Sequence, residues 1–271
     1  MRAACGLAGL VFFAFCLGAG ASAAQAATRS PYLEDLSWTE LRDALAAGTT
    51  TIIVPVGGTE QSGPHLALGK HNGRVKVLAG QIASALGDTL VAPVVAYVPE
   101  GSVTPPTEHM RFPGTISVPV AAFKGVLEGA AQSFKQAGFT QILLIGDHGG
   151  YQAQLKEVAE RLDRQWAGTP AHAHFIAAYY NATQAAYRQA LRAKGLSDAE
   201  IGIHAGAADT SLELATNPRM VRSDRLAAAP DAKSGVEGDP RRASVELGRI
   251  GVDLIVNDTV AAIKKARLEK H

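Results

Sequence analysis

The sequence contains very little cysteine: Cys5 and Cys16 are the only two among 271 residues, and both lie near the N-terminus. Residues 1–26 combine Arg2 with a short apolar run and the small-residue stretch ASAAQA, which is the pattern of a cleavable secretory signal peptide. The mature chain, residues 27–271, would then contain no thiol. This excludes a disulfide framework, a cysteine nucleophile and a thiolate zinc site. Any metal would have to be held by histidine, carboxylates and water.

The alternative for the N-terminal segment is a membrane anchor, and the segment lacks the length for it. Its strongly apolar part extends from Leu7 to Leu17, whereas a membrane-spanning helix needs about 20 apolar residues. We therefore expect cleavage near Ala26, which predicts a periplasmic or secreted protein with no membrane contact after cleavage.

An excess of one charge is also absent. The chain has 26 basic and 25 acidic side chains, well mixed along its length, and a net charge of +1. This gives no indication of a nucleic-acid partner or of an anionic membrane surface. Two catalytic motifs are missing as well. There is no G-x-S-x-G nucleophile elbow, and the glycine-rich GDHGG turn lacks the Lys and Ser/Thr of a P-loop.

Strand-like apolar runs alternate with helical patterns from residue 36 onward. Strands are expected at 50–57, at 89–101 with an interruption at Pro93, at 139–147 and at 171–180. Helices are expected at 36–48, 72–87, 118–138, 151–168, from 209, and at 243–271. Strands separated by helices predict βαβ units and a mostly parallel sheet covered on both faces. The alternation resumes after the two long polar loops, 99–119 and 229–244, so residues 27–271 are predicted to form one α/β domain.

Histidines and carboxylates follow the carboxyl end of each expected strand. They are Glu60, His65 and His71 after the first, Glu100, Glu108 and His109 after the second, Asp147 and His148 after the third, and Asn181, His204 and Asp209 after the fourth. Because these ends meet at one edge of a parallel sheet, where ligands bind, we expect a metal or acid–base site there. His172 and His174 lie inside a strand pattern and are interpreted as structural.

Four segments, in order, resemble the creatininase (creatinine amidohydrolase) family. The chain reads EQSGPHLALGKH, EHMRFPGTISV, GDHGGY and HAGAADTS between Val54 and Leu214. The family typically reads E-Q-H-G-P-H-L-P-x-x-x-D, E-H-x-x-F-P-G-T-I-S, N-G-H-G-G-N and H-A-G-x-x-E-T-S. Its members are metal-dependent amidohydrolases with a three-layer α/β/α fold, often hexameric, and typically bind two zinc or manganese ions. The resemblance therefore implies this fold, a homo-oligomer and a small-molecule amide substrate.

The resemblance also assigns residues, and some of them depart from the family pattern. Glu60 and His148 match metal ligands, and His204 matches a histidine near the metals that helps proton transfer. Ser62 stands in place of a ligand histidine, and His71 in place of the aspartate that bridges two ions. An imidazole offers one lone pair to one metal, whereas a carboxylate can bridge two. We therefore predict one ion rather than two, with zinc favoured and manganese the alternative.

Asp209 replaces the glutamate of E-T-S, so it is expected either to ligate the metal or to act from behind the ligands. The expected metal ligands are Glu60, His71, His148 and Asp209; the expected catalytic residues are His204 and Asp209; and the expected substrate-binding residues are Ser62, His65, Glu108, His109, Asp147 and Tyr151.

These observations predict a hydrolase that cleaves a cyclic or linear amide C–N bond with one zinc-activated water. The alternative is a non-catalytic periplasmic protein that binds a small molecule on the same scaffold, since the departures fall on the ligand set and function depends on the site. The substituted side chains are still polar and able to coordinate, which favours the enzyme.

Overall fold

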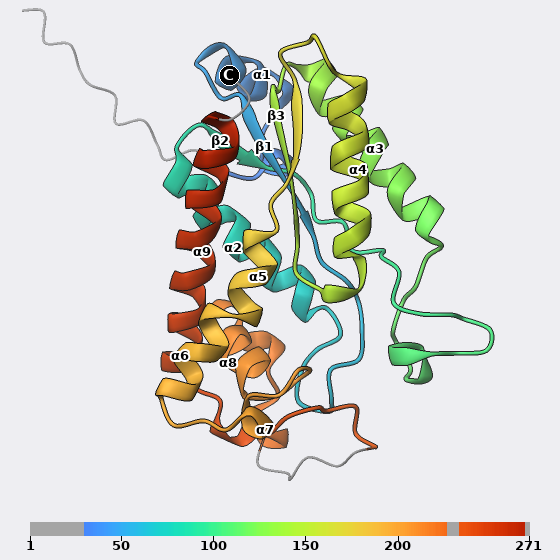
Figure 1. The fold of residues 1–271 in the computed structure, drawn as a ribbon, viewed down its shortest axis with the longest axis vertical. Coiled ribbons are helices and arrows are strands. Elements are labelled where there is room, and N and C mark those ends of the chain that lie inside the picture. The colour runs from blue at the N-terminus through green and yellow to red at the C-terminus, as the bar shows by residue number, and fades with distance from the viewer. Residues whose placement is uncertain (1–29, 227–232, 269–271) are drawn as a thin grey trace, which may run out of the picture.

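The computed structural model describes residues 30–226 and 233–268, so the predicted signal peptide, residues 1–26, lies outside the described part of the chain (Figure 1). A parallel sheet with the strand order β2-β1-β3-β4 forms its centre. The strands are β1 (Thr51–Val56), β2 (Thr89–Val91), β3 (Gln141–Gly146) and β4 (His172–Phe175). The predicted parallel α/β architecture is confirmed.

Successive residues of the central strands face opposite layers of helices. In β1, Ile52 and Val54 pack into one buried apolar cluster, and Ile53 between them packs into the other. In β3, Leu144 and Leu143 divide in the same way. Both faces of these strands are covered, which is why their sequences are unbroken apolar runs rather than alternating patterns.

Helices cover both faces of the sheet and give three layers (Figure 1). One layer contains α1 (Trp38–Ala46), α3 (Val120–Ala137) and α4 (Gln152–Gln165); the other contains α2 (Lys70–Leu86), α5 (Ala178–Gln184) and α9 (Val245–Leu268). The shorter helices α6 (Ala186–Ala193), α7 (Asp198–Ile201) and α8 (Ala207–Thr216) gather at the lower end of the view. No helix among the described residues has both the length and the apolar character that a bilayer crossing requires.

Two expected element boundaries are wrong, and one interruption and one cap are confirmed. The strand expected at 89–101 is interrupted at Pro93, which has no N–H for the ladder: β2 ends at Val91, and an isolated bridge between Val56 and Val95 continues the pairing. The strand expected at 171–180 ends at Phe175, and the alanine-rich stretch after it begins α5, since alanine favours the helix. Helix α2 begins at Lys70 rather than at residue 72. Ser37 caps α1 as expected and forms a capping box with Glu40.

Candidate metal centre

The loop after β1 carries Glu60 to the carboxyl edge of the sheet. Gly58 has a φ of +151°, and a Cβ atom there would lie 2.6 Å from Glu100 Oε1, so only glycine suits this turn. Asn72, on the first turn of α2, accepts a hydrogen bond from the Gly58 N–H and donates one to Thr59 Oγ1. These contacts fix the loop against the helix and hold Glu60 in a fully buried position.

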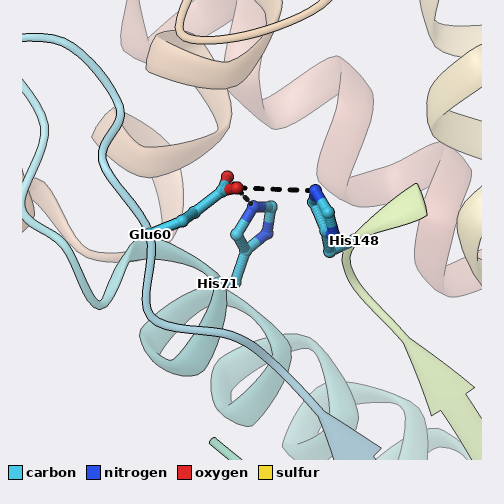
Figure 2. Close-up of side chains that lie close together, drawn as sticks. All are labelled: Glu60, His71 and His148. Carbon is cyan, nitrogen blue, oxygen red and sulfur yellow. Dashed lines mark hydrogen bonds and ion pairs between the residues drawn. The ribbon is translucent and has the colours of Figure 1, made fainter. Parts of the chain in front are cut away.

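Glu60 is a buried carboxylate surrounded by four imidazoles. Its Oε1 lies 2.8 Å from His71 Nε2, and its Oε2 lies 3.4 Å from His148 Nε2 (Figure 2). On the other side, Oε1 is 3.6 Å from His204 Nδ1 and Oε2 is 3.3 Å from His109 Nε2. Within the described residues, Oε2 has no hydrogen-bond partner. A buried carboxylate oxygen left in this state is costly unless a cation or a donor reaches it.

His71 lies between two carboxylates. Its Nε2 faces Glu60, and its Nδ1 lies 2.5 Å from Asp147 Oδ2. Burial and the ammonium of Lys70 lower the pKa of His71, but its contacts with Asp147 and Glu60 outweigh them and raise it to about 9. A carboxylate behind Nδ1 is the arrangement that orients a metal-binding histidine and makes Nε2 more basic.

His148 follows β3 and points toward Glu60 from the opposite side. Burial lowers the pKa of His148 to about 4, although Glu60 acts to raise it, so the imidazole is neutral near pH 7. The hydroxyl of Tyr151 accepts a hydrogen bond from the His148 backbone N–H and donates to the carbonyl of Gly57 at 2.5 Å. Tyr151 therefore ties the end of β3 to the end of β1.

The donor atoms of Glu60, His71 and His148 lie within 4.8 Å of one another. Zinc ligands at about 2 Å in a tetrahedral arrangement are about 3.3 Å apart, close to the 3.4 Å between Glu60 Oε2 and His148 Nε2. Two imidazoles and one carboxylate, whose buried Oε2 has no hydrogen bond, fit one divalent ion. Glu60, His109 and His204 form a second group of three possible donors.

Gln61 determines which nitrogen of each histidine in that second group carries the proton. The side-chain amide of Gln61 lies 2.9 Å from His109 Nδ1, so Nδ1 accepts and Nε2–H of His109 points toward Glu60. His204 Nε2 lies 2.9 Å from the backbone carbonyl oxygen of Gln61, so Nε2 donates and Nδ1 keeps a lone pair. The rings of His109 and His204 stack with their centroids 4.3 Å apart. Burial, and to a smaller extent the positive charge of Lys70, lower the pKa of His204 to about 3.

A buried network of cations lies beside these groups. Lys70 Nζ is 2.8 Å from Asp209 Oδ2 and 3.5 Å from Glu60 Oε1. Arg74 lies 2.7 Å from Asp147 and 2.9 Å from Asp209 Oδ1. Burial raises the pKa of Asp209, but Lys70 and Arg74 hold it well below its usual range. The expectation that Asp209 joins the ligands is not met, because both of its oxygens bind these cations.

The residues expected to bind substrate divide into three sets. His109 and Asp147 line a cavity of about 220 Å³ together with His71, His148, Lys70 and Tyr180. Ser62, His65 and Tyr151 are buried and do not line it, and Glu108 is exposed on a short 3-10 turn. His65 instead binds Thr210 at 3.0 Å, and Ser62 Oγ has no partner among the described residues. The structure therefore places none of these four side chains at the lining of the cavity.

Sequence reasoning missed Lys70, Arg74 and Gln61. A signal for the first two was available. Lys70 and Arg74 are one helical turn apart and share a face of α2 with Leu78 and Ile82, all of them buried. Basic residues on an otherwise apolar helix face indicate buried ion pairs. The role of Gln61 has no signal in the sequence, because it depends on where His109 and His204 lie.

Comparison with known proteins places the chain. The family model described as Creatininase: Creatinine amidohydrolase matches residues 34–263. This chain belongs to the creatininase family. It is 28% identical over 263 residues to the mycofactocin precursor peptide peptidase of Mycobacterium ulcerans (strain Agy99), and the aligned region covers 88% of this chain and 93% of that protein. It is 26% identical over 208 residues to the creatinine amidohydrolase of Pseudomonas putida, covering 76% and 79% of the two chains.

Solved creatininase structures have the same fold. One of them, a mutant creatininase described as Zn-Zn type, superposes with a TM-score of 0.73 at 24% identity, over 88% of this chain and 99% of that chain. The three-layer α/β/α prediction is therefore confirmed, and the family is one of metal-dependent amidohydrolases.

Proposed function

We propose that this protein hydrolyses an amide C–N bond at a single divalent ion held by Glu60, His71 and His148. The observation that carries the proposal is the buried Oε2 of Glu60. It lacks a hydrogen bond among the described residues, and it faces the neutral imidazole of His148 at 3.4 Å, with Asp147 supporting His71 from behind. Zinc suits this set of ligands best, and manganese is the alternative.

The remaining residues have the orientation that amide hydrolysis needs. A bound divalent ion would polarise the amide carbonyl and lower the pKa of the attacking water towards about 7. His109 lines the cavity, and its Nε2–H would turn from Glu60 Oε2 to the carbonyl oxygen once the metal takes that carboxylate oxygen. The free Nδ1 of His204 would take the proton of the water and pass it to the leaving nitrogen, so the C–N bond breaks and a carboxylic acid and an amine form.

The substrate class is bounded by the cavity of about 220 Å³, which suits a small amide or one end of a peptide. The mycobacterial relative is named a peptidase of a precursor peptide, and the Pseudomonas relative is named for creatinine. We propose the non-peptide amide as the substrate, with peptide cleavage as the competing outcome.

A metal and turnover assay tests the proposal. Purified protein, the same protein stripped with a chelator, and the stripped protein reloaded with zinc or manganese are assayed on creatinine, other cyclic and linear amides, and short peptides. We expect activity to be lost on stripping and restored on reloading. His172→Ala removes an imidazole of β4 that pairs with Asp163 outside the site, and serves as the matched control. Metal binding without turnover of any compound would favour the small-molecule-binding alternative.

We also propose that the chain is exported to the periplasm or secreted after cleavage near Ala26, and that it forms a homo-oligomer, with a hexamer as the expectation from the family resemblance. Mass spectrometry of the mature protein and light scattering test the two statements. A soluble cytoplasmic product that retains Met1 would contradict the first, and a monomer at micromolar concentration would contradict the second.

A further inference from the structure

Lys70 is a fully buried cation between two carboxylates of the site. Its Nζ lies 2.8 Å from Asp209 Oδ2 and 3.5 Å from Glu60 Oε1, and the side chain has no exposed surface. An ammonium group is a compact point charge with three donors. Burying it is costly unless carboxylates compensate, and here two do so. This side chain is therefore a fixed positive charge inside the cluster, rather than a surface lysine that has folded inward.

The structure contains two possible cation positions that share one carboxylate. Glu60, His71 and His148 form the first, and Glu60, His109 and His204 form the second. Lys70 lies on the side of Glu60 Oε1, the oxygen that also faces His204 at 3.6 Å. A metal ion in the second position would have to share this oxygen with an ammonium group that is already in contact with it.

The second position is also poorly prepared for a metal. Gln61 holds His109 with its Nε2–H toward Glu60, so this nitrogen offers a proton and no lone pair. The neighbouring carboxylate, Asp209, is not free to complete a ligand set, because it is bound by Lys70, Arg74 and the backbone N–H of Ala205. At the first position His71 Nε2 also faces Glu60 with a proton, but the carboxylate of Asp147 behind Nδ1 makes this nitrogen the stronger ligand once a metal ion displaces that proton.

We propose that Lys70 is a permanent second cation of this site, taking the place and the charge that a second metal ion would have beside Glu60, His109 and His204. The protein then binds one divalent ion where a two-metal enzyme binds two. This inference rests on the proposed function for the first ion. Lys70 also lines the cavity, so the charge of the ammonium acts on whatever the cavity holds.

Metal titration tests the proposal without reference to activity. The intact protein, Lys70→Met and Lys76→Met are stripped and titrated with zinc chloride, and equivalents per chain are measured by calorimetry and elemental analysis. Methionine retains the length of the side chain and removes its charge. Lys76 lies on the same helix but is partly exposed and pairs with Glu34, so Lys76→Met is the matched control. We expect one equivalent for the intact protein and for Lys76→Met.

For Lys70→Met we expect a second equivalent, with an affinity for the second ion at least 100-fold above that of the intact protein. Two equivalents in the intact protein, or one in a folded Lys70→Met, would overturn the inference and leave the proposed function standing. No metal in the intact protein would overturn both. If Lys70→Met does not fold, crystals of the intact protein soaked in zinc decide the matter by anomalous scattering. One peak, at Glu60, His71 and His148, supports the role of Lys70, and a second peak beside His204 contradicts it.

Discussion

Two histidines lie on each side of Glu60, and the two sides differ in the groups that hydrogen-bond to these histidines. On one side, His71 is backed by a carboxylate, Asp147, at 2.5 Å. On the other, His109 and His204 are held by the side-chain amide and the backbone carbonyl of Gln61. A carboxylate makes an imidazole a stronger ligand, whereas the amide and the carbonyl set its tautomer without adding charge. The four histidines lie 2.8–3.6 Å from the same carboxylate, and we propose that one side serves metal binding and the other proton transfer.

The electrostatics of the two sides differ in the same direction. The pKa of His71 is raised to about 9 against the effect of burial, because two carboxylates contact it. The pKa of His204 is lowered to about 3, because burial and Lys70 act together and Glu60 compensates only in part. A divalent ion would have to replace the proton on His71 Nε2, whereas His204 is already neutral near pH 7.

The largest expected effect comes from removing the metal side. His71→Ala deletes a proposed ligand and leaves Asp147 with Arg74 and Tyr179 as its partners. We expect metal affinity to fall by at least 100-fold and turnover to be lost with it. Elemental analysis and activity of the same sample measure both. A His71→Ala protein that retains one tightly bound ion would remove His71 from the ligand set.

Replacing a histidine on the other side of Glu60 should separate metal binding from turnover. In His204→Gln the metal content should stay at one equivalent, while turnover falls by about 10²–10⁴-fold, which is the usual contribution of a positioned acid–base group. The measurements are metal equivalents and kcat. Loss of the metal together with activity would show that both sides bind the ion, and the comparison between them would fail.

Asp147→Asn should weaken the metal side without deleting a ligand. The amide keeps the shape of Asp147 but removes the charge behind His71, so we expect metal affinity to fall by about 10–100-fold while kcat of the fully loaded protein changes little. Asp163→Asn is the matched control, because Asp163 pairs with His172 at 3.0 Å in another part of the fold. Equal metal affinities for the two variants would contradict a role for Asp147 in orienting the ligand.

Some of this arrangement follows from the sequence and some does not. The apolar run of β1 predicts a buried parallel strand. The motifs place Glu60 after β1 and His148 after β3, both at the carboxyl edge of the sheet. His71 was expected in the loop and lies instead on the first turn of α2, because the helix begins at Lys70. The pairing of Lys70 with Asp209 joins positions 139 residues apart, and only the packing of α2 against α8 brings them together.

The same limit explains the residues that changed role. Asp209 has the chemistry of a ligand in the sequence, but two buried cations bind it in the fold, and a single sequence does not reveal which charges become neighbours. Ser62 and His65 belong to a motif that leads to the site, yet their side chains pack behind it. The motifs therefore locate the site, and the packing of the fold decides which of their side chains face the cavity.

Glu213→Gln should have the smallest effect on metal and turnover, because Glu213 lies beneath the metal side and touches none of the proposed ligands. Its Oε1 is 3.5 Å from Arg74 Nη1 without a hydrogen bond, since Arg74 is shared with Asp147 and Asp209. Burial therefore outweighs the attraction of Arg74 and raises the pKa of Glu213 to about 8, so the buried side chain is a neutral acid at pH 7.

The consequence is a stability difference that depends on pH. Between pH 4.5, the ordinary pKa of a glutamate side chain, and about pH 8, the folded protein holds a proton on Glu213 that the unfolded chain has released, so this group lowers stability as pH rises through that window. Glutamine does not titrate. We expect Glu213→Gln to match the intact protein near pH 4.5, to become progressively more stable above it, and to reach a constant advantage above pH 8. One pKa unit corresponds to about 1.4 kcal/mol, so the final difference is a few kcal/mol. Urea unfolding at pH 5, 7 and 9 measures the difference in free energy of unfolding between the two proteins. The same difference at all three pH values would mean that Arg74 keeps Glu213 ionised.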